Sequence, residues 1–460
     1  MKYDLNLTWN KLKENPEALE IVKEYLPGME IMVNHNPNAA RVSIGSAMRY
    51  APDLFPEDKV NDLKEKLAIY SANLGLTDEE KEKVASYKDL AKKRLEKSAS
   101  STKKSDIRRD AIYPGKPWLD TNGNRIQAHA GALIYDDGAY YWYGENKEYT
   151  TGKNKIWTWG IRAYRSTDLY NWDDMGLIVE PDLDNPDANL FPEKCVDRPH
   201  IIKCKKTNKY VMWIKISGAE SCFTILEADK LLGPYKLVKE DYYPLDTRVG
   251  DFDIYVDEET DVAYMFMDAD HKRIAGYVLS EDYLSVDREI SSQYEGLHAP
   301  FHREGVTLFT RDNKKYLITS GVSGYTPNQS DSAMTDSWES VFETVGDPHV
   351  EDESMASFNS QISQVFRVNG TDLYIAIADR WMPKHLLDGK SADAVRRAIA
   401  CKYEPDKYQA TEEEKAMFAA RPDLERADTS IADYVWLPVI FDNQKPKIKW
   451  FDSWKIEDLL

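Results

Sequence analysis

The sequence is poor in cysteine, in long apolar stretches and in net positive charge. Its four cysteines, Cys195, Cys204, Cys222 and Cys401, form no CxxC pair, so we expect neither a disulfide scaffold nor a zinc site built on thiolates. The first thirty residues contain no uninterrupted apolar segment of the signal-peptide type, and no later segment is apolar enough to span a bilayer. We therefore expect a cytoplasmic protein.

The charge of the chain argues against two classes of partner. With 79 acidic and 60 basic residues, the formal net charge is -19. Nucleic acids and anionic membranes both require clustered Lys and Arg, so we expect neither as a partner. Aromatic residues, by contrast, are abundant at 12% of the chain. Such rings build cores and can also stack on the faces of sugars.

Residues 1–104 are predicted to form a helical accessory domain. Pro16 begins one amphipathic run, Pro56 begins another, and Thr77 with Glu80 forms a capping box before a third. The segment 98–106, SASSTKKSD, is typical of a solvated linker, which places the domain boundary between residues 104 and 105. Because the apolar helix faces need a partner, we expect this domain to serve assembly into a homo-oligomer or to border a binding pocket.

Residues 105–460 contain a long-period repeat of hairpins. Five turns are centred near residues 137, 207, 259, 313 and 369, at spacings of about 70, 52, 54 and 56 residues. A four-stranded propeller blade takes roughly this length, whereas the turns of a β-sandwich recur about every 8–12 residues. The sequence therefore predicts an all-β, five-bladed β-propeller. Its last blade carries a helical insertion at about residues 384–432, where Thr411 and Glu414 form a second capping box.

Each hairpin begins on a polar residue. Eight to ten positions upstream of the five turns lie His129, Asp197, Asp251, Glu304 and Gln361. The innermost strands of a propeller line one channel, so these side chains should converge on one mouth. Arg198 and Arg303 could neutralise the acids in a structural ion-pair plug. For the ring as a whole, we favour a binding site.

Carboxylates on neighbouring blades are the groups that hydrolysis of a glycosidic bond requires. One protonates the leaving oxygen, and a second group deals with water or with the anomeric carbon. Aromatic residues supply candidate walls that would stack on sugars, although several are expected to be core: Tyr140–Tyr143, Trp157, Trp159, Tyr325, Trp381 and Trp436.

A set of ordered segments resembles glycoside hydrolase family 43, most closely its exo-β-1,3-galactanase group. They include DTNGNRIQAHAGALIYDDGAYYWYGEN, DRPHIIKCKKTNKYVMW, REGVTLF, SFNSQ and YVWLP, and the resemblance covers about three quarters of the chain. It implies a five-bladed inverting enzyme that releases galactose from the end of a β-1,3-linked galactan or galacto-oligosaccharide. An oligosaccharide is therefore the expected partner.

The same resemblance assigns roles to individual residues. Glu304 would be the general acid, and Asp251 the carboxylate that tunes and orients it. Gln361 lies where the group carries a glutamine near the anomeric carbon, and no carboxylate base appears at the start of the first blade. The residues expected to contact substrate are Gln127, His129, Glu145, Asp197, Glu295, Tyr325 and Trp381. The chain departs from the family pattern at Asp197, where Glu is usual, and at Gly305–Val306, where Ala-Pro is usual.

Two other functions stay open on the sequence: an arabinofuranosidase or xylosidase of the same family, and a non-catalytic glycan-binding propeller that has lost its base. Without a carboxylate base, we expect Gln361 to position the attacking water and a neighbouring acid, Glu145 or Asp197, to share in removing its proton.

No cofactor and no metal site are expected. His298 and His302 are four residues apart, but Pro300 between them argues against a helical metal pair. A structural ion in the propeller channel beside His129 remains compatible with the sequence.

Overall fold

The computed structural model describes residues 3–100, 108–218, 220–421 and 427–460, and these form two compact units. The first unit is Met1–Ser101 together with the segments Asp182–Phe191 and Ser217–Ser221, and the second is the remainder of the chain. The expected domain boundary and most of the expected linker fall at residues 101–107, outside the described residues. The linker prediction is wrong for residues 98–100, because they form the last turn of a helix.

The first unit is helical. Its described α-helices are α1 (Trp9–Leu12), α2 (Pro16–Tyr25), α3 (Pro27–His35), α4 (Ile44–Tyr50), α5 (Glu57–Leu74) and α6 (Asp78–Ser100). Pro16 occupies the first turn of α2, and Pro56 immediately precedes α5, as expected from the fixed φ of proline. The capping box before α6 is confirmed, since Glu80 N donates to Thr77 Oγ1 at 3.2 Å and Thr77 N donates to Glu80 Oε2 at 2.8 Å.

This unit has its own core, so its helices bury much of their apolar surface against one another. Trp9, Leu12, Val22, Leu63 and Leu67 are all at most 3% exposed in one cluster.

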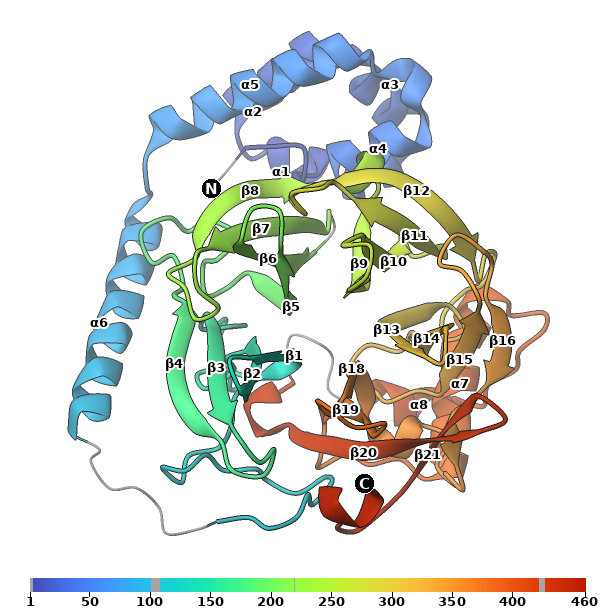
Figure 1. Ribbon diagram of the computed structural model, residues 1–460. Coiled ribbons are helices and arrows are strands. Elements are labelled where there is room, and N and C mark those ends of the chain that lie inside the picture. Colours follow the sequence, from blue (N-terminus) through green and yellow to red (C-terminus); the bar gives the residue numbers. More distant parts are fainter. Residues whose placement is uncertain (1–2, 101–107, 219, 422–426) are drawn as a thin grey trace. The chain divides into compact units, whose positions relative to one another are not determined.

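The second unit is a five-bladed β-propeller, which confirms the predicted fold (Figure 1). Blades 1 and 2 consist of β1 (His129–Asp136), β2 (Ala139–Glu145), β3 (Ile161–Ser166), β4 (Asp173–Val179), β5 (Cys195–Cys204), β6 (Lys209–Ser217), β7 (Cys222–Ala228) and β8 (Lys236–Tyr242). Blades 3 and 4 consist of β9 (Val249–Val256), β10 (Ala263–Ala269), β11 (Arg273–Leu279), β12 (Val286–Gln293), β13 (Arg303–Arg311), β14 (Lys314–Gly321), β15 (Ser330–Thr335) and β16 (Glu343–Gly346). Blade 5 consists of β18 (Gln361–Arg367), β19 (Tyr374–Arg380), β20 (Asp433–Asp442) and β21 (Lys445–Lys449), with β17 (His349–Val350) added in parallel to β21.

The first strand of each blade faces the centre of the ring. These strands contact one another in the cyclic order β1, β5, β9, β13, β18 and back to β1. Three of them begin one or two residues earlier than expected, β5 at Cys195, β9 at Val249 and β13 at Arg303. The five polar positions therefore lie in the first three residues of the five inner strands.

Backbone and side-chain hydrogen bonds both close the ring between blades 5 and 1. In the segment that leads into blade 1, Gly115 N donates to Tyr434 O of β20 at 2.7 Å, and Ile112 and Trp454 exchange backbone hydrogen bonds at 2.9 and 3.0 Å. The amide of Gln364 accepts from Leu133 N at 2.7 Å and donates to Leu133 O at 3.2 Å, which imitates a strand pair. Ser363 Oγ also donates to Gly131 O at 2.7 Å.

The helical insertion lies between β19 and β20, as expected. It contains α7 (Gly389–Tyr403) and α8 (Glu412–Ala419), and the capping box of Thr411 and Glu414 is present. Residues of α7, including Val395 and Ile399, form a small core with Ala356 and Leu387. No helix among the described residues has the length and apolar character needed to cross a membrane.

Several aromatic residues proposed as stacking walls belong instead to the core. Trp142 and Trp436 are at most 1% exposed, with ring centroids 4.7 Å apart, and Tyr140, Tyr143 and Trp159 are also buried. Each blade of a propeller packs between two neighbouring blades, so both faces of its strands are covered. The position of an aromatic residue in a strand therefore does not reveal whether the ring reaches solvent.

Candidate active site

Glu304 lies in the second position of β13, where the strand is distorted. Its backbone pairs with Ser320 on β14, and the register then shifts before Thr307. The side chain is half-buried. The carboxyl group is therefore at the inner edge of blade 4, at the end of the channel where the inner strands begin.

Asp251 on β9 is the centre of a charged cluster beside Glu304. Its Oδ1 accepts a hydrogen bond from Lys215 Nζ at 2.7 Å, and its Oδ2 lies 3.1 Å from Arg198 Nε. The backbone N–H of Gly305, the residue after Glu304, donates to the same Oδ2 at 3.0 Å. Asp251 thus links blade 3 to the strand that carries Glu304, and two cations hold it in its charged form.

Burial and charge separate the pKa values of these two carboxyl groups. Burial and, next in size, the negative charge of Asp251 together raise the pKa of Glu304 to about 8, although Lys215 and Arg198 oppose the shift. Burial would also raise the pKa of Asp251, but Arg198 and Lys215 outweigh it and lower that pKa well below its usual range. Near neutral pH, Glu304 therefore carries a proton beside an ionised Asp251. Two carboxyls with divergent pKa values are a common arrangement for acid catalysis.

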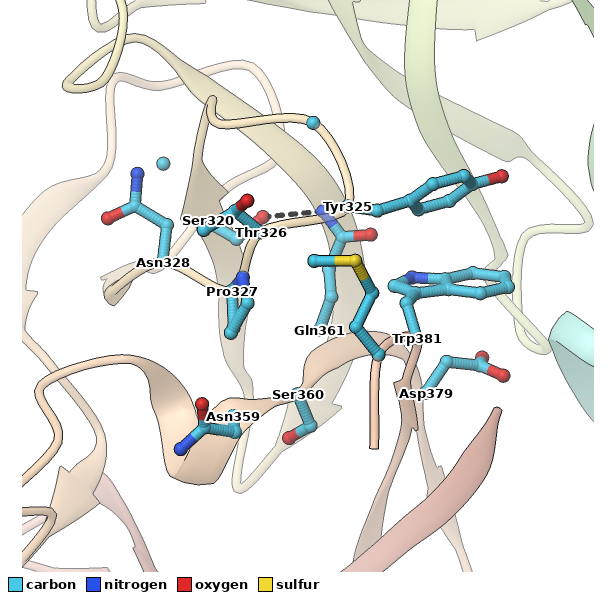
Figure 2. Close-up of a pocket in the computed structure, with 13 residues that line it drawn as sticks. Ser320, Tyr325, Thr326, Pro327, Asn328, Asn359, Ser360, Gln361, Asp379 and Trp381 are labelled. Atoms are coloured by element: carbon cyan, nitrogen blue, oxygen red, sulfur yellow. Dashed lines mark hydrogen bonds between the residues drawn. The ribbon is translucent and has the colours of Figure 1, made fainter. Parts of the chain in front are cut away.

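Gln361, at the start of β18, approaches Glu304 from blade 5. Its Nε2 donates to Ser320 Oγ at 2.9 Å (Figure 2). The same Nε2 lies 3.4 Å from Glu304 Oε1. Because both neighbours of Nε2 act as acceptors, the amide oxygen Oε1 is left to face other groups. The structure thus brings together all three residues that the sequence assigned to catalysis.

Gly305 makes this approach possible. Its φ is +62°, and a Cβ at this position would lie 2.6 Å from Ser320 Oγ and 3.2 Å from Gln361 Cγ. Only glycine fits there without strain or displacement. The departure from the family pattern at this position therefore has a local reason that the sequence alone does not reveal.

Glu145 and Asp197 form a second acidic pair, on blades 1 and 2. Glu145 is 1% exposed, its Oε2 lies 2.8 Å from Lys147 Nζ, and its Oε1 accepts the backbone N–H of Arg198 at 3.0 Å. Burial raises the pKa of Glu145 to about 7 despite the opposing charge of Lys147. Asp197 accepts from Trp157 Nε1 at 3.2 Å and lies 3.6 Å from Lys215 Nζ. Lys215 thus bridges Asp197 and Asp251.

Two aromatic residues from the predicted site line the pocket beside Gln361. The rings of Tyr325 and Trp381 lie one above the other, with centroids 5.1 Å apart and planes at 42° (Figure 2). Trp157 also stacks on Tyr325, with ring centroids 6.0 Å apart and planes at 21°. The pocket drawn in Figure 2 is lined by Ser320, Tyr325, Gln361, Asp379 and Trp381, among others. An aromatic wall beside carboxyl groups is suited to a sugar ring.

His129 and Gln127 do not reach this surface, so the expectation that they contact substrate directly needs correction. His129 is fully buried, its Nδ1 is 2.9 Å from Asp379 Oδ1, and its Nε2 is 3.0 Å from Gln127 Oε1. Gln127 in turn donates from Nε2 to Ser430 O at 2.9 Å. Burial lowers the pKa of His129, although Asp379 opposes this, so the imidazole is held in its neutral form. Both residues instead support the wall that carries Asp379.

Glu295 is placed differently from the other predicted acids. Its side chain is exposed and accepts a hydrogen bond from Ser292 Oγ at 2.5 Å, in the connection that follows β12. No described hydrogen bond or ion pair joins it to Glu304 or Asp251. Its role in substrate binding stays a prediction.

Sequence reasoning missed four residues of the site: Lys215, Ser320 and Gly305, which position the catalytic candidates, and Arg198, which was considered only as a plug. Lys215 lies in the second strand of its blade, seven residues from the end of the hairpin turn, within the apolar run YVMWIKIS. A lysine in the middle of a buried strand must be paired, and this was the available signal.

A raised-pKa carboxyl beside an ionised one, at the start of the inner strands of a five-bladed propeller and next to an aromatic wall, is an arrangement typical of glycoside hydrolases. The chain belongs to the glycosyl hydrolases family 43, whose family model matches residues 121–361, more than half of the 460 residues. That range contains Asp197, Asp251 and Glu304 and ends on Gln361.

Solved structures agree in fold. A β-1,3-galactosidase of glycoside hydrolase family 43 is 26% identical with a TM-score of 0.60, over 76% of this chain and 64% of that chain, so this chain spans less than two thirds of its length. An exo-β-1,3-galactanase from Phanerochaete chrysosporium, solved with β-1,3-galactotriose, is 21% identical with a TM-score of 0.60, over 76% of this chain and 68% of that chain. A second β-1,3-galactosidase of the family, solved with galactodeoxynojirimycin, is 22% identical with a TM-score of 0.59, over 75% of this chain and 100% of that chain. Among curated protein sequences, none matches this chain significantly.

Proposed function

We propose that this protein is an inverting, exo-acting hydrolase that releases galactose from β-1,3-linked galactan or galacto-oligosaccharides. The observation that carries the proposal is Glu304, whose pKa of about 8 keeps it protonated near neutral pH beside the ionised Asp251. The choice of sugar and linkage is supported by the names of the similar structures, a β-1,3-galactosidase and an exo-β-1,3-galactanase.

In this proposal Glu304 is the general acid. It donates its proton to the glycosidic oxygen as the bond to the anomeric carbon breaks, and the neighbouring Asp251 stays ionised because Lys215 and Arg198 compensate its charge. The carboxylate that Glu304 becomes is then stabilised by the same two cations. Asp251 touches no reacting atom in this scheme and acts as a positioning residue.

Gln361 would position the attacking water. Its amide N–H groups point at Glu304 and Ser320, so its Oε1 is the atom that accepts a hydrogen bond from the water. An amide is a poor base, and the proton must therefore pass to an acid nearby. Asp197 suits this role better than Glu145, because its side chain is 17% exposed and that of Glu145 only 2%.

The test is product analysis on β-1,3- and β-1,6-galacto-oligosaccharides, with the released anomer followed by NMR. Galactose as the sole first product, formed with the inverted configuration from the β-1,3 series, is the expected result. Retained configuration would exclude the inverting mechanism. Turnover of aryl arabinofuranosides or xylosides, with none of galactosides, would assign the chain to the other activities of the family. Saturable binding without turnover would indicate a glycan-binding protein.

A further inference from the structure

Three side chains that touch no reacting group in the proposed reaction meet beside the segment that leads into the Glu304 strand. Asp268 is the last residue but one of β10, His271 lies in the turn that joins β10 to β11, and His302 immediately precedes β13. Each offers one ligand atom, and these atoms all lie within 4.8 Å of one another. His302 Nε2 is 2.8 Å from Asp268 Oδ1, and His271 Nδ1 contacts Asp268 Oδ2. The sequence had paired His302 only with His298.

The surroundings of this cluster are built around Asp268. Its side chain is fully buried, and His302 is 2% exposed. Gly250 faces Asp268 so closely that a Cβ on this residue would lie 2.4 Å from Asp268 Oδ2. Only glycine at position 250, one residue before Asp251, leaves room for the Asp268 carboxylate.

Neither imidazole is committed to a described partner outside the cluster. In the described residues, Asp268 is the only hydrogen-bond partner of either ring, and the Nδ1 of His302 is buried with no partner at all. His271 keeps 46% of its side chain exposed, which provides an entry path for an ion. Ligand atoms around a tetrahedral Zn²⁺ are about 3.3 Å apart, so both imidazoles, which now contact Asp268 directly, would move away from its carboxylate to admit the ion.

We propose that Asp268, His271 and His302 bind a divalent transition-metal ion, with Zn²⁺ as the reference ion. Two imidazoles and one carboxylate suit Zn²⁺, Co²⁺ or Fe²⁺, whereas Ca²⁺ and Mg²⁺ require mostly oxygen ligands. The exposed side of His271 leaves a coordination position for water. The bound ion would tie the β10–β11 turn to the segment that leads into Glu304, and so fix the start of β13.

The experiment uses the full chain, stripped of metal with a chelator and titrated with Zn²⁺ by calorimetry. The variant is His271→Asn, because His271 has a φ of +54° that asparagine tolerates better than most residues. The matched control is His298→Asn, an exposed histidine in the same connection as His302. Wild type and His298→Asn should bind one equivalent of Zn²⁺. The loss of a direct ligand in His271→Asn should weaken binding by at least the roughly 10–100-fold that loss of an outer-sphere partner costs.

Two further measurements, thermal unfolding and visible absorption, test metal binding without an activity assay. Zn²⁺ should raise the midpoint of thermal unfolding of wild type and control but not of His271→Asn, since a ligand that binds the folded state stabilises it. Co²⁺-loaded wild type should show the visible absorption bands of a nitrogen-ligated site, and this result decides the matter even if the variant does not fold. No saturable Zn²⁺ binding by wild type, or equal affinity in wild type and His271→Asn, would overturn the proposal. Either result would make the cluster a hydrogen-bonded clamp.

Discussion

Replacing Asp251 by Asn should move the basic limb of the pH–activity profile to lower pH. Glu304 works as an acid only while protonated, so activity is expected to fall as pH rises through its pKa of about 8. Asp251→Asn removes a negative charge that raises this pKa, and it leaves Lys215 and Arg198 without their shared partner. Both changes act in the same direction, because uncompensated cations favour the ionised form of Glu304.

The size of the shift follows from the strength of close charge interactions. A charge within about 4–6 Å changes a carboxyl pKa by roughly 1–3 units, so the basic limb should move from about pH 8 to between about pH 5 and 7. The assay is kcat/KM against pH on a substrate with a poor leaving group, because that ratio reports the ionisation of the free enzyme.

Two further variants fix the sign and the locality of the effect. The charge of Lys215 lowers the pKa of Glu304, so Lys215→Gln should move the basic limb to higher pH, opposite to Asp251→Asn. Asp253→Asn is the matched control on the same strand, since Asp253 is also buried and accepts a backbone N–H of β13, from Leu308 at 2.7 Å. The basic limb of the pH–activity profile of Asp253→Asn should stay near that of the wild type. A basic limb that does not move in a folded Asp251→Asn protein, or that moves upward, would refute the electrostatic account.

Three other substitutions test the remaining parts of the site. Glu304→Gln should lower kcat by roughly 10²–10⁴-fold on substrates with poor leaving groups and much less on activated aryl glycosides, and equal losses on both would contradict its role as the acid. Gly305→Ala should lower both kcat and the unfolding midpoint, because the left-handed backbone costs about 1–2 kcal/mol and the new methyl group displaces Gln361. Gly138→Ala, at φ +78° with nothing within 4 Å, should share the backbone cost and keep full kcat. Gln361→Ala should turn over slowly while still inverting, as followed by NMR of the first anomer, and full activity would remove this residue from the mechanism.

The fold could be predicted because each blade of a propeller repeats the same hairpin, so the turns recur along the sequence at a regular spacing. Hairpin turns near residues 137, 207, 259, 313 and 369 gave the number of blades, and counting back from them located the inner strand starts to within two residues. The capping boxes before α6 and α8 could also be predicted from the sequence, since a capping box depends on residues only three positions apart.

The parts of the site that escaped prediction depend on contacts between distant residues. Lys215 is 36 positions from Asp251, and His302 is 34 positions from Asp268, so neither pairing has a local spacing to reveal it. The need for glycine at position 305 arises from a positive φ and from the approach of another blade. The sequence considered His302 only beside His298 and argued against a metal pair there, because no local spacing links His302 to Asp268.

The five polar positions of the inner strands also show that equivalent places in a propeller need not have equivalent roles. His129, on blade 1, is fully buried because Asp379 of blade 5 and Gln127 cover both of its nitrogens, and this network helps to join the last blade to the first. Glu304 and Gln361 remain half-buried beside a pocket, and the pKa of Glu304 is raised. The seam between blades 5 and 1 is closed by the His129 network together with backbone hydrogen bonds such as the one from Gly115 N to Tyr434 O. Equivalent starting positions thus serve ring closure on blade 1 and, in the proposed function, chemistry on blades 4 and 5.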